Sequence, residues 1–139
     1  MTDIQNWSGA DVRRELPASR ILVVDDEPAV RQLIRRLLVE HGYLVHEAGD
    51  GHQALEMVRA APDRVDLVVS DIQMPRVNGI QLLQALSVEC PKLPFVMISG
   101  YAPEELQKFG IAAPCGILAK PLVAPVFLAE VARCLAQRN

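Results

Sequence analysis

The chain has 139 residues, half of them hydrophobic, and a formal net charge of −3. This length suits one domain with a core of ordinary size and leaves too little chain for a second. The acidic balance and the lack of a basic run argue against direct nucleic-acid binding. No stretch has the apolar length of a secretion signal or a membrane span, so we expect no membrane insertion.

Cysteine usage and the N-terminal composition bear on location and domain limits. Cys90, Cys115 and Cys134 are odd in number and far apart, and they show neither a disulfide framework nor a zinc-ligand spacing. We therefore expect reduced thiols and a cytoplasmic protein. Residues 1–19 are mostly polar and are expected to form a flexible extension, with a single folded domain over residues 20–139.

From residue 20 onward, short runs rich in Val, Ile and Leu alternate with segments of helical period. This alternation is typical of an α/β fold, in which helices cover both faces of a parallel sheet. The expected strands are 21–25, 43–48, 66–71, 95–99 and 117–119.

The helices are predicted from the 3.6-residue spacing of apolar side chains. In the first helix one face is apolar, and it comprises Val30, Leu33, Ile34, Leu37 and Leu38. Arg31, Arg35 and Arg36 occupy the other face, and Gly42 closes the helix. Further helices are expected over 51–60, over 78–87 and over 124–137, the last with Phe127, Val131 and Leu135 facing inward. A fourth helix starting near Pro103 is expected to be short, because Gly110 and Pro114 oppose its continuation.

Polar residues stand at the ends of four predicted strands. They are Asp25 and Asp26 after the first strand, Asp71 after the third, Ser99 after the fourth and Lys120 after the fifth. Taken singly, each has an ordinary explanation as a helix cap, a turn residue or a solvated side chain. Ligands of doubly wound sheets bind at the carboxyl ends of the strands, however, and this is where all of these residues are expected to meet.

Three carboxylates without partners would repel one another and raise their pKa values, and a bound divalent cation relieves this repulsion. Oxygen ligands favour magnesium, with Asp26 and Asp71 as direct ligands and Asp25 acting directly or through water. A carboxylate beside such an ion can attack phosphorus and form an aspartyl phosphate. Lys120 would then supply positive charge, while the Ser99 hydroxyl and the Gly100 amide donate hydrogen bonds.

Four motifs, ILVVDDEP, DLVVSDIQMPRVNG, VMISGY and LAKPL, follow one another in this order. Together they resemble the receiver domain of two-component response regulators, over roughly residues 20–137. The resemblance implies a doubly wound five-stranded parallel sheet of the flavodoxin-like type, with strand order 2-1-3-4-5.

The resemblance also implies a signalling function. Asp71 is expected to accept a phosphoryl group from a histidine kinase or a histidine phosphotransfer protein. Mg²⁺, with Mn²⁺ as an alternative, is expected at Asp25, Asp26, Asp71 and the Gln73 carbonyl, and Ser99 and Lys120 are expected to contact the phosphoryl group. The protein would catalyse only its own phosphorylation and dephosphorylation. Because no output domain follows Asn139, we expect it to switch contacts with an unidentified protein target, unless it is one domain of a hybrid kinase.

Several positions modify this expectation. Receivers usually carry an aromatic residue a few positions before the lysine, but this chain has Ile117, which has no ring to rotate. Tyr101 is a candidate replacement for the moving group, and its bulk beside Gln73 should slow hydrolysis. The bond before Pro121 could be cis, which would turn the lysine toward the site.

Two other functions are disfavoured. A magnesium-dependent phosphatase or phosphotransferase typically places two carboxylates two residues apart on one strand and adds a capping insertion. In this chain Asp25 and Asp26 are adjacent, and there is no length for the insertion. A degenerate structural receiver is disfavoured because the acidic residues, Ser99 and Lys120 are all present.

Overall fold

A computed structural model describes residues 18–74, 76–100 and 113–137. Its centre is a five-stranded sheet in which every neighbouring pair is parallel and the order is β2-β1-β3-β4-β5. The strands are β1 (Arg20–Val24), β2 (Leu44–Ala48), β3 (Leu67–Asp71), β4 (Phe95–Ser99) and β5 (Gly116–Ala119). The predicted fold class and strand order are confirmed.

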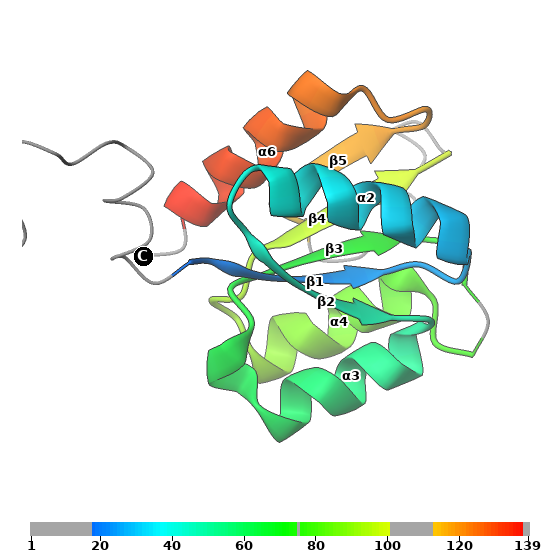
Figure 1. Cartoon of the computed structure of the whole chain (residues 1–139). Coiled ribbons are helices and arrows are strands. Elements are labelled where there is room, and N and C mark those ends of the chain that lie inside the picture. The colour runs from blue at the N-terminus through cyan, green and yellow to red at the C-terminus, as the bar shows by residue number, and fades with distance from the viewer. Residues whose placement is uncertain (1–17, 75, 101–112, 138–139) are drawn as a thin grey trace, which may run out of the picture.

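Helices cover both faces of the sheet. The described α-helices are α2 (Pro28–Glu40), α3 (Gly51–Ala60), α4 (Gly79–Glu89) and α6 (Ala124–Ala136), with a short 3₁₀ turn, η2 (Pro62–Arg64). Helices α2 and α6 lie on one face, and α3 and α4 lie on the other (Figure 1). The predicted short fourth helix falls on residues outside the described part. None of the described helices has the length and apolarity needed to cross a bilayer.

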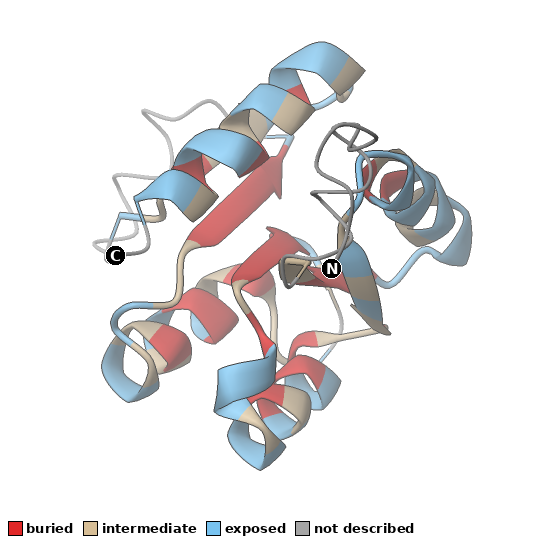
Figure 2. Ribbon diagram, turned by 60° about the vertical axis from the view of Figure 1, so that its left-hand side comes forward, coloured by how far each residue is buried: buried red, intermediate tan, exposed pale blue. Residues whose placement is uncertain are grey.

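The three central strands are almost entirely buried (Figure 2), and their side chains belong to a separate core on each face of the sheet. On the face of α3 and α4, Leu22, Val68 and Met97 are buried against these helices. On the face of α2 and α6, Ile21, Val69 and Phe127 are buried. Because successive side chains of a strand point to opposite faces, continuous apolar runs are required in β1, β3 and β4.

Strand β2 departs from the prediction that all strands are covered on both faces. It forms an edge of the sheet, and its first four residues alternate between exposed and partly buried, with Leu44 half exposed and only Ala48 buried. Its tyrosine neighbour, Tyr43, lies just outside the strand. The prediction failed here because a short apolar run does not distinguish an edge strand from a central one.

Helix ends follow local capping chemistry. Asn78 caps α4 by accepting a hydrogen bond from the Gln81 amide, and the Gln81 side chain accepts one from the Asn78 amide in return. Asp50 caps α3 by accepting a hydrogen bond from the Gln53 amide. After α2 the chain turns at Gly42 with a φ of 89°, a conformation that favours glycine.

The structure corrects the expectation of three reduced thiols. Cys115 and Cys134 form a disulfide across a sequence separation of 19, and Cys90 is the free cysteine among the described residues. The disulfide joins the start of β5 to the end of α6. The sequence spacing gave no sign of it because the contact is created only when α6 packs beside β5.

Candidate functional site

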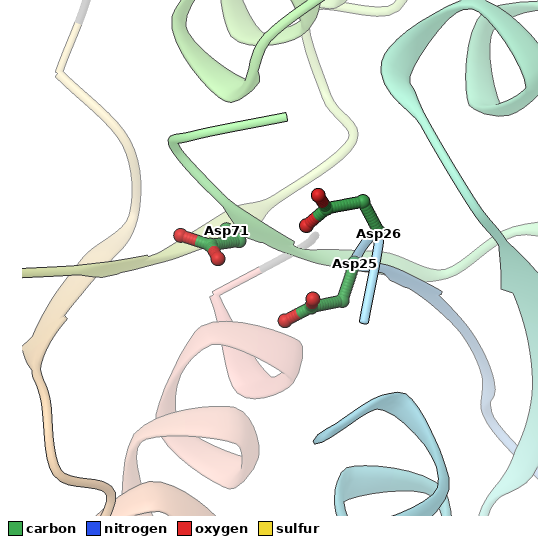
Figure 3. A group of neighbouring side chains, drawn as sticks. All are labelled: Asp25, Asp26 and Asp71. Carbon is green, nitrogen blue, oxygen red and sulfur yellow. The ribbon is translucent and has the colours of Figure 1, made fainter. Parts of the chain in front are cut away.

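The end of β1 presents two adjacent carboxylates in different surroundings. Asp25 is only 2% exposed; its amide donates to the Ala48 carbonyl at 3.1 Å, and its Oδ1 accepts from the Glu27 amide at 2.9 Å. Asp26 is exposed. Asp71 is the last residue of β3 and is buried. The carboxylate oxygens of Asp25, Asp26 and Asp71 lie within 4.8 Å of one another (Figure 3).

Strands β4 and β5 bring the hydroxyl and the ammonium to the same edge. Lys120 Nζ donates to Asp71 Oδ2 at 2.9 Å. The Lys120 amide donates to the Ser99 carbonyl at 2.9 Å, so the end of β5 is tied to the end of β4. Ser99 is fully buried, and the Lys120–Pro121 bond is cis, one of the two states that the sequence left open.

The charges of the site act on one another. Burial raises the pKa of Asp25; the Glu27 amide opposes this shift, and the nearby Asp71 and Asp26 add to it. For Lys120, burial acts to lower the pKa, but the hydrogen bond and attraction of Asp71 outweigh it, so the pKa is raised. The site is therefore a region of negative potential that favours a bound cation.

The chain after Asp71 is held by two glycines. The Gly79 amide donates to the Ile72 carbonyl at 2.8 Å, and a Cβ at Gly79 would clash with the Asp71 carbonyl oxygen. The Gly51 amide donates to the Val77 carbonyl at 2.9 Å, and a Cβ there would clash with the same carbonyl. These contacts fasten the loop between β3 and α4 to the start of α3.

A pocket of about 600 Å³ opens above these groups. Its wall includes Asp26, Glu27, Asp71, Gln73 and Lys120. A small molecule or ion can therefore approach the Asp71 carboxylate from solvent. An all-oxygen set of carboxylates beside an open pocket matches the preference of Mg²⁺, which keeps several waters.

The remaining predicted residues that the structure describes have different surroundings. Gln73 is exposed, and its amide lies 3.4 Å from Asp71 Oδ1. Gly100 is exposed directly after β4. Ile117 pairs with Met97 and packs against the core on the α3 and α4 face. Tyr101 lies outside the described residues.

One residue near the site was not predicted from the sequence. Arg31, assigned to the polar face of the first helix, donates from Nη1 to the Asp25 carbonyl at 2.7 Å. Helical periodicity separates apolar from polar faces, and it carries no information on which polar side chain reaches a backbone carbonyl.

Residues 21–132 match the family model of the response regulator receiver domain. The chain is 40% identical over 105 residues to the sensor kinase CckA of Brucella abortus, covering 75% of this chain and 11% of that protein. It is 38% identical over 121 residues to the response regulator MprA of Mycobacterium ulcerans, covering 86% of this chain and 51% of that protein. The chain thus spans about half or less of these relatives.

Solved structures agree with the sequence matches. The chemotaxis protein CheY4 of Vibrio cholerae aligns with a TM-score of 0.76 at 30% identity, over 85% of this chain and 99% of that one. A chain of the CheX-CheY-BeF3-Mg complex from Borrelia burgdorferi aligns with a TM-score of 0.74 at 25% identity, over 83% and 87%. On the family match, the strand order and the relatives together, this chain belongs to the response regulator receiver domain family of two-component signalling.

Proposed function

We propose that Asp71 accepts a phosphoryl group from a phosphohistidine of a histidine kinase or histidine phosphotransfer protein, and that this modification switches the protein's contacts with a target. The main support is the hydrogen bond from Lys120 Nζ to Asp71 Oδ2 at 2.9 Å. It lies within a cluster in which the carboxylate oxygens of Asp25, Asp26 and Asp71 are within 4.8 Å of one another. A nucleophile, a cation and a metal-binding acidic group are thus adjacent. The relatives support the proposal, because they include a sensor kinase and a response regulator.

The residues present fit a magnesium ion. Asp26 and Asp71 would hold it directly, Asp25 directly or through water, and the Gln73 carbonyl would complete the protein's share of the ligands. When bound, Mg²⁺ supplies positive charge for the phosphoryl oxygens and lowers the repulsion among the carboxylates. Burial first, and then the charges of Asp71 and Asp26, raise the pKa of Asp25 although Lys120 and the Glu27 amide act to lower it, and a cation bound among these carboxylates would favour the ionised form.

In the transfer step, a carboxylate oxygen of Asp71 forms a bond to phosphorus as the bond between phosphorus and the donor imidazole nitrogen breaks. The electron pair of the broken bond stays on that nitrogen, and the histidine is released. Phosphoryl transfer requires alignment and positive charge more than covalent assistance from the protein. Lys120 provides that charge, and the Ser99 hydroxyl and the Gly100 amide donate hydrogen bonds to the phosphoryl oxygens.

The phosphoryl group would act as a switch because it changes the charge that Lys120 faces. Lys120 now binds the Asp71 carboxylate and is joined through its own amide to Ser99. A new dianionic partner would draw both residues toward it and shift the segments that follow β4 and β5. In this proposal the chain catalyses only its own phosphorylation and dephosphorylation, in the cytoplasm.

Acetyl phosphate with Mg²⁺, followed by intact-mass measurement, tests the proposal. We expect one added phosphoryl group on the native protein, none on Asp71→Asn, and none on native protein treated with EDTA. Asp63→Asn is the matched control, because Asp63 is an exposed carboxylate of η2. An Asp71→Asn variant that still gains the group, or repeated turnover of a phosphate ester, would overturn the proposal.

A further inference from the structure

Arg31 lies between the ends of β1 and β2, and its guanidinium has two partners. Nη1 donates to the Asp25 carbonyl at 2.7 Å, and Nε donates to Glu47 Oε1 at 2.9 Å. The Arg31 side chain is only 20% exposed, so these bonds are partly shielded from water. The neighbouring Arg35 binds the other oxygen of Glu47 at 2.7 Å and is half exposed.

We infer that Arg31 is a positioning residue for the metal site, which acts by fixing the backbone between Asp25 and Asp26. The inference rests on the proposed function, in which these two aspartates bind Mg²⁺. The hydrogen bonds of the Arg31 guanidinium go to the Asp25 carbonyl and to Glu47, and not to the Asp25 or Asp26 carboxylates. It acts through the peptide unit that joins them.

The geometry explains how this contact would set the direction of the carboxylates. The Asp25 amide is already fixed by its bond to the Ala48 carbonyl of β2. The Asp25 carbonyl, at the other end of the residue, leaves the sheet and is held by Arg31 instead. With both ends fixed, the peptide plane that leads into Asp26 has one orientation, and so the Asp26 side chain starts from one position.

Arg31 is itself held in place. Glu47 pairs with Val23 in the β1–β2 register, which puts its carboxylate beside the last residues of β1. Its pKa is lowered, first by the hydrogen bond from Arg35 and also by that from Arg31, so Glu47 stays ionised over the physiological range. The negative charge of Glu47 offsets the positive charge of the Arg31 guanidinium. Without Glu47, this positive charge would repel a cation at the acidic site more strongly.

This arrangement yields a test in which two effects have opposite signs. A positive charge near a metal site weakens cation binding. If Arg31 acted only through its charge, its removal would strengthen Mg²⁺ binding. If Arg31 instead positions the backbone between Asp25 and Asp26, its removal would weaken Mg²⁺ binding. Partners that orient metal ligands typically change metal affinity by about 10–100-fold when removed.

The experiment measures Mg²⁺ affinity of the full chain by isothermal titration calorimetry, for native protein, Arg31→Met and Arg35→Met. We expect Arg31→Met to bind Mg²⁺ about tenfold more weakly, the low end of the usual range for such partners. Arg35→Met is the matched control, since it removes a second arginine from Glu47 without touching Asp25. It should bind Mg²⁺ as native protein does.

A second readout separates positioning from a loss of folding. Acetyl phosphate labelling is followed over a range of Mg²⁺ concentrations. The half-saturating concentration should rise for Arg31→Met, while the rate at saturating Mg²⁺ stays near the native rate. If Arg31→Met does not fold, Arg31→Gln replaces it in both measurements, because the shorter glutamine side chain does not reach the Asp25 carbonyl.

Native-like or tighter Mg²⁺ binding by Arg31→Met, or equal weakening in Arg35→Met, would overturn the inference and leave the proposed function intact. Failure of the native protein to bind Mg²⁺ would instead overturn the proposed function, and the inference with it. The two failures are therefore distinguishable in one set of titrations.

Discussion

Asp25 is a buried carboxylate in a cluster of like charge, and its ionised form is costly without a cation. Burial and the neighbouring Asp71 and Asp26 raise its pKa above the reference value of 3.8. A carboxyl whose folded pKa is raised favours the folded state when it is protonated. As the pH rises through that folded pKa, the group loses protons more readily in the unfolded chain, and stability falls.

We therefore expect Asp25→Asn to stabilise the metal-free protein at neutral pH by about 1 kcal/mol, or roughly 4 °C in melting temperature. The asparagine oxygen can keep the bond to the Glu27 amide. Thermal unfolding in EDTA across the acidic to neutral range measures the effect, which should shrink as the pH is lowered. In Mg²⁺ the order should reverse, because native protein gains stability from binding and the variant gains little.

Asp63→Asn, at an exposed carboxylate, is the control and should leave the melting temperature unchanged in both conditions. A metal-free Asp25→Asn that melts below native protein would show that the carboxylate is not a source of repulsion.

Much of the candidate site could be predicted from residues because its members follow strand ends directly in sequence. Asp25, Asp71 and Ser99 were placed at one edge by the rule that parallel strands end together. The same rule placed Lys120 at this edge, where its Nζ donates a hydrogen bond to Asp71. Arg31 could not be predicted, because its partner is a carbonyl whose orientation depends on how the first helix packs across β1 and β2.

At the scale of elements, the loop between β3 and α4 depends on the close approach of Gly79 to Asp71. A side chain at Gly79 would meet the Asp71 carbonyl and the Ile72 Cα, and these are backbone atoms that cannot rotate away. The first residue of α4 therefore has to be glycine for β3 and α4 to meet as they do.

We expect Gly79→Ala to lower the free energy of unfolding by about 1–3 kcal/mol, the usual cost of overpacking, despite the better helix propensity of alanine. The shifted loop should also slow the labelling of Asp71 by acetyl phosphate. Urea unfolding and intact-mass time courses measure the two effects.

Gly49→Ala is the matched control, since its Cβ would make only ordinary contacts, at 3.6 Å from Gln53 Oε1 and 3.8 Å from Arg31 Nη1. If both variants are equally stable, the backbone at Gly79 relaxes without cost and the steric explanation is wrong.

The elements themselves were predictable to the extent that their signals are local. Helix α3 was predicted with its observed bounds, and α4 and α6 within two residues at each end, because periodicity and caps lie within the element. Leu33 is the exception on the apolar face of α2, being 55% exposed. Burial depends on neighbours that the local pattern does not contain.

For the molecule as a whole, the Cys115–Cys134 disulfide closes a segment that contains β5, Lys120 and most of α6. It does so at the start of β5, whereas Lys120 follows the end of that strand. The cross-link thus lies at the opposite end of the sheet from the candidate site. Its stabilising effect and the chemistry at Asp71 should therefore be separable.

Reduction should lower the free energy of unfolding by about 3 kcal/mol, the value expected for a closed loop of this length. Urea unfolding with and without a reductant measures the difference, and thiol titration of the denatured, unreduced protein should find one free thiol, that of Cys90. Cys115→Ser should unfold like reduced native protein in both conditions, and Cys90→Ser should unfold like native protein. Three free thiols before reduction would contradict the cross-link.

The rate of acetyl phosphate labelling should be the same in oxidised and reduced protein under conditions where both are folded. The Asp71 and Lys120 contacts are held by the β3–β4 and β4–β5 ladders and by the Lys120 amide bond to Ser99, none of which involves a cysteine. A rate that falls on reduction while the protein remains folded would mean that the cross-linked end of β5 controls the position of Lys120. In that case a change at the start of β5 would shift Lys120 at its other end. The redox state of the compartment would then control the phosphorylation of Asp71 as well as the free energy of unfolding.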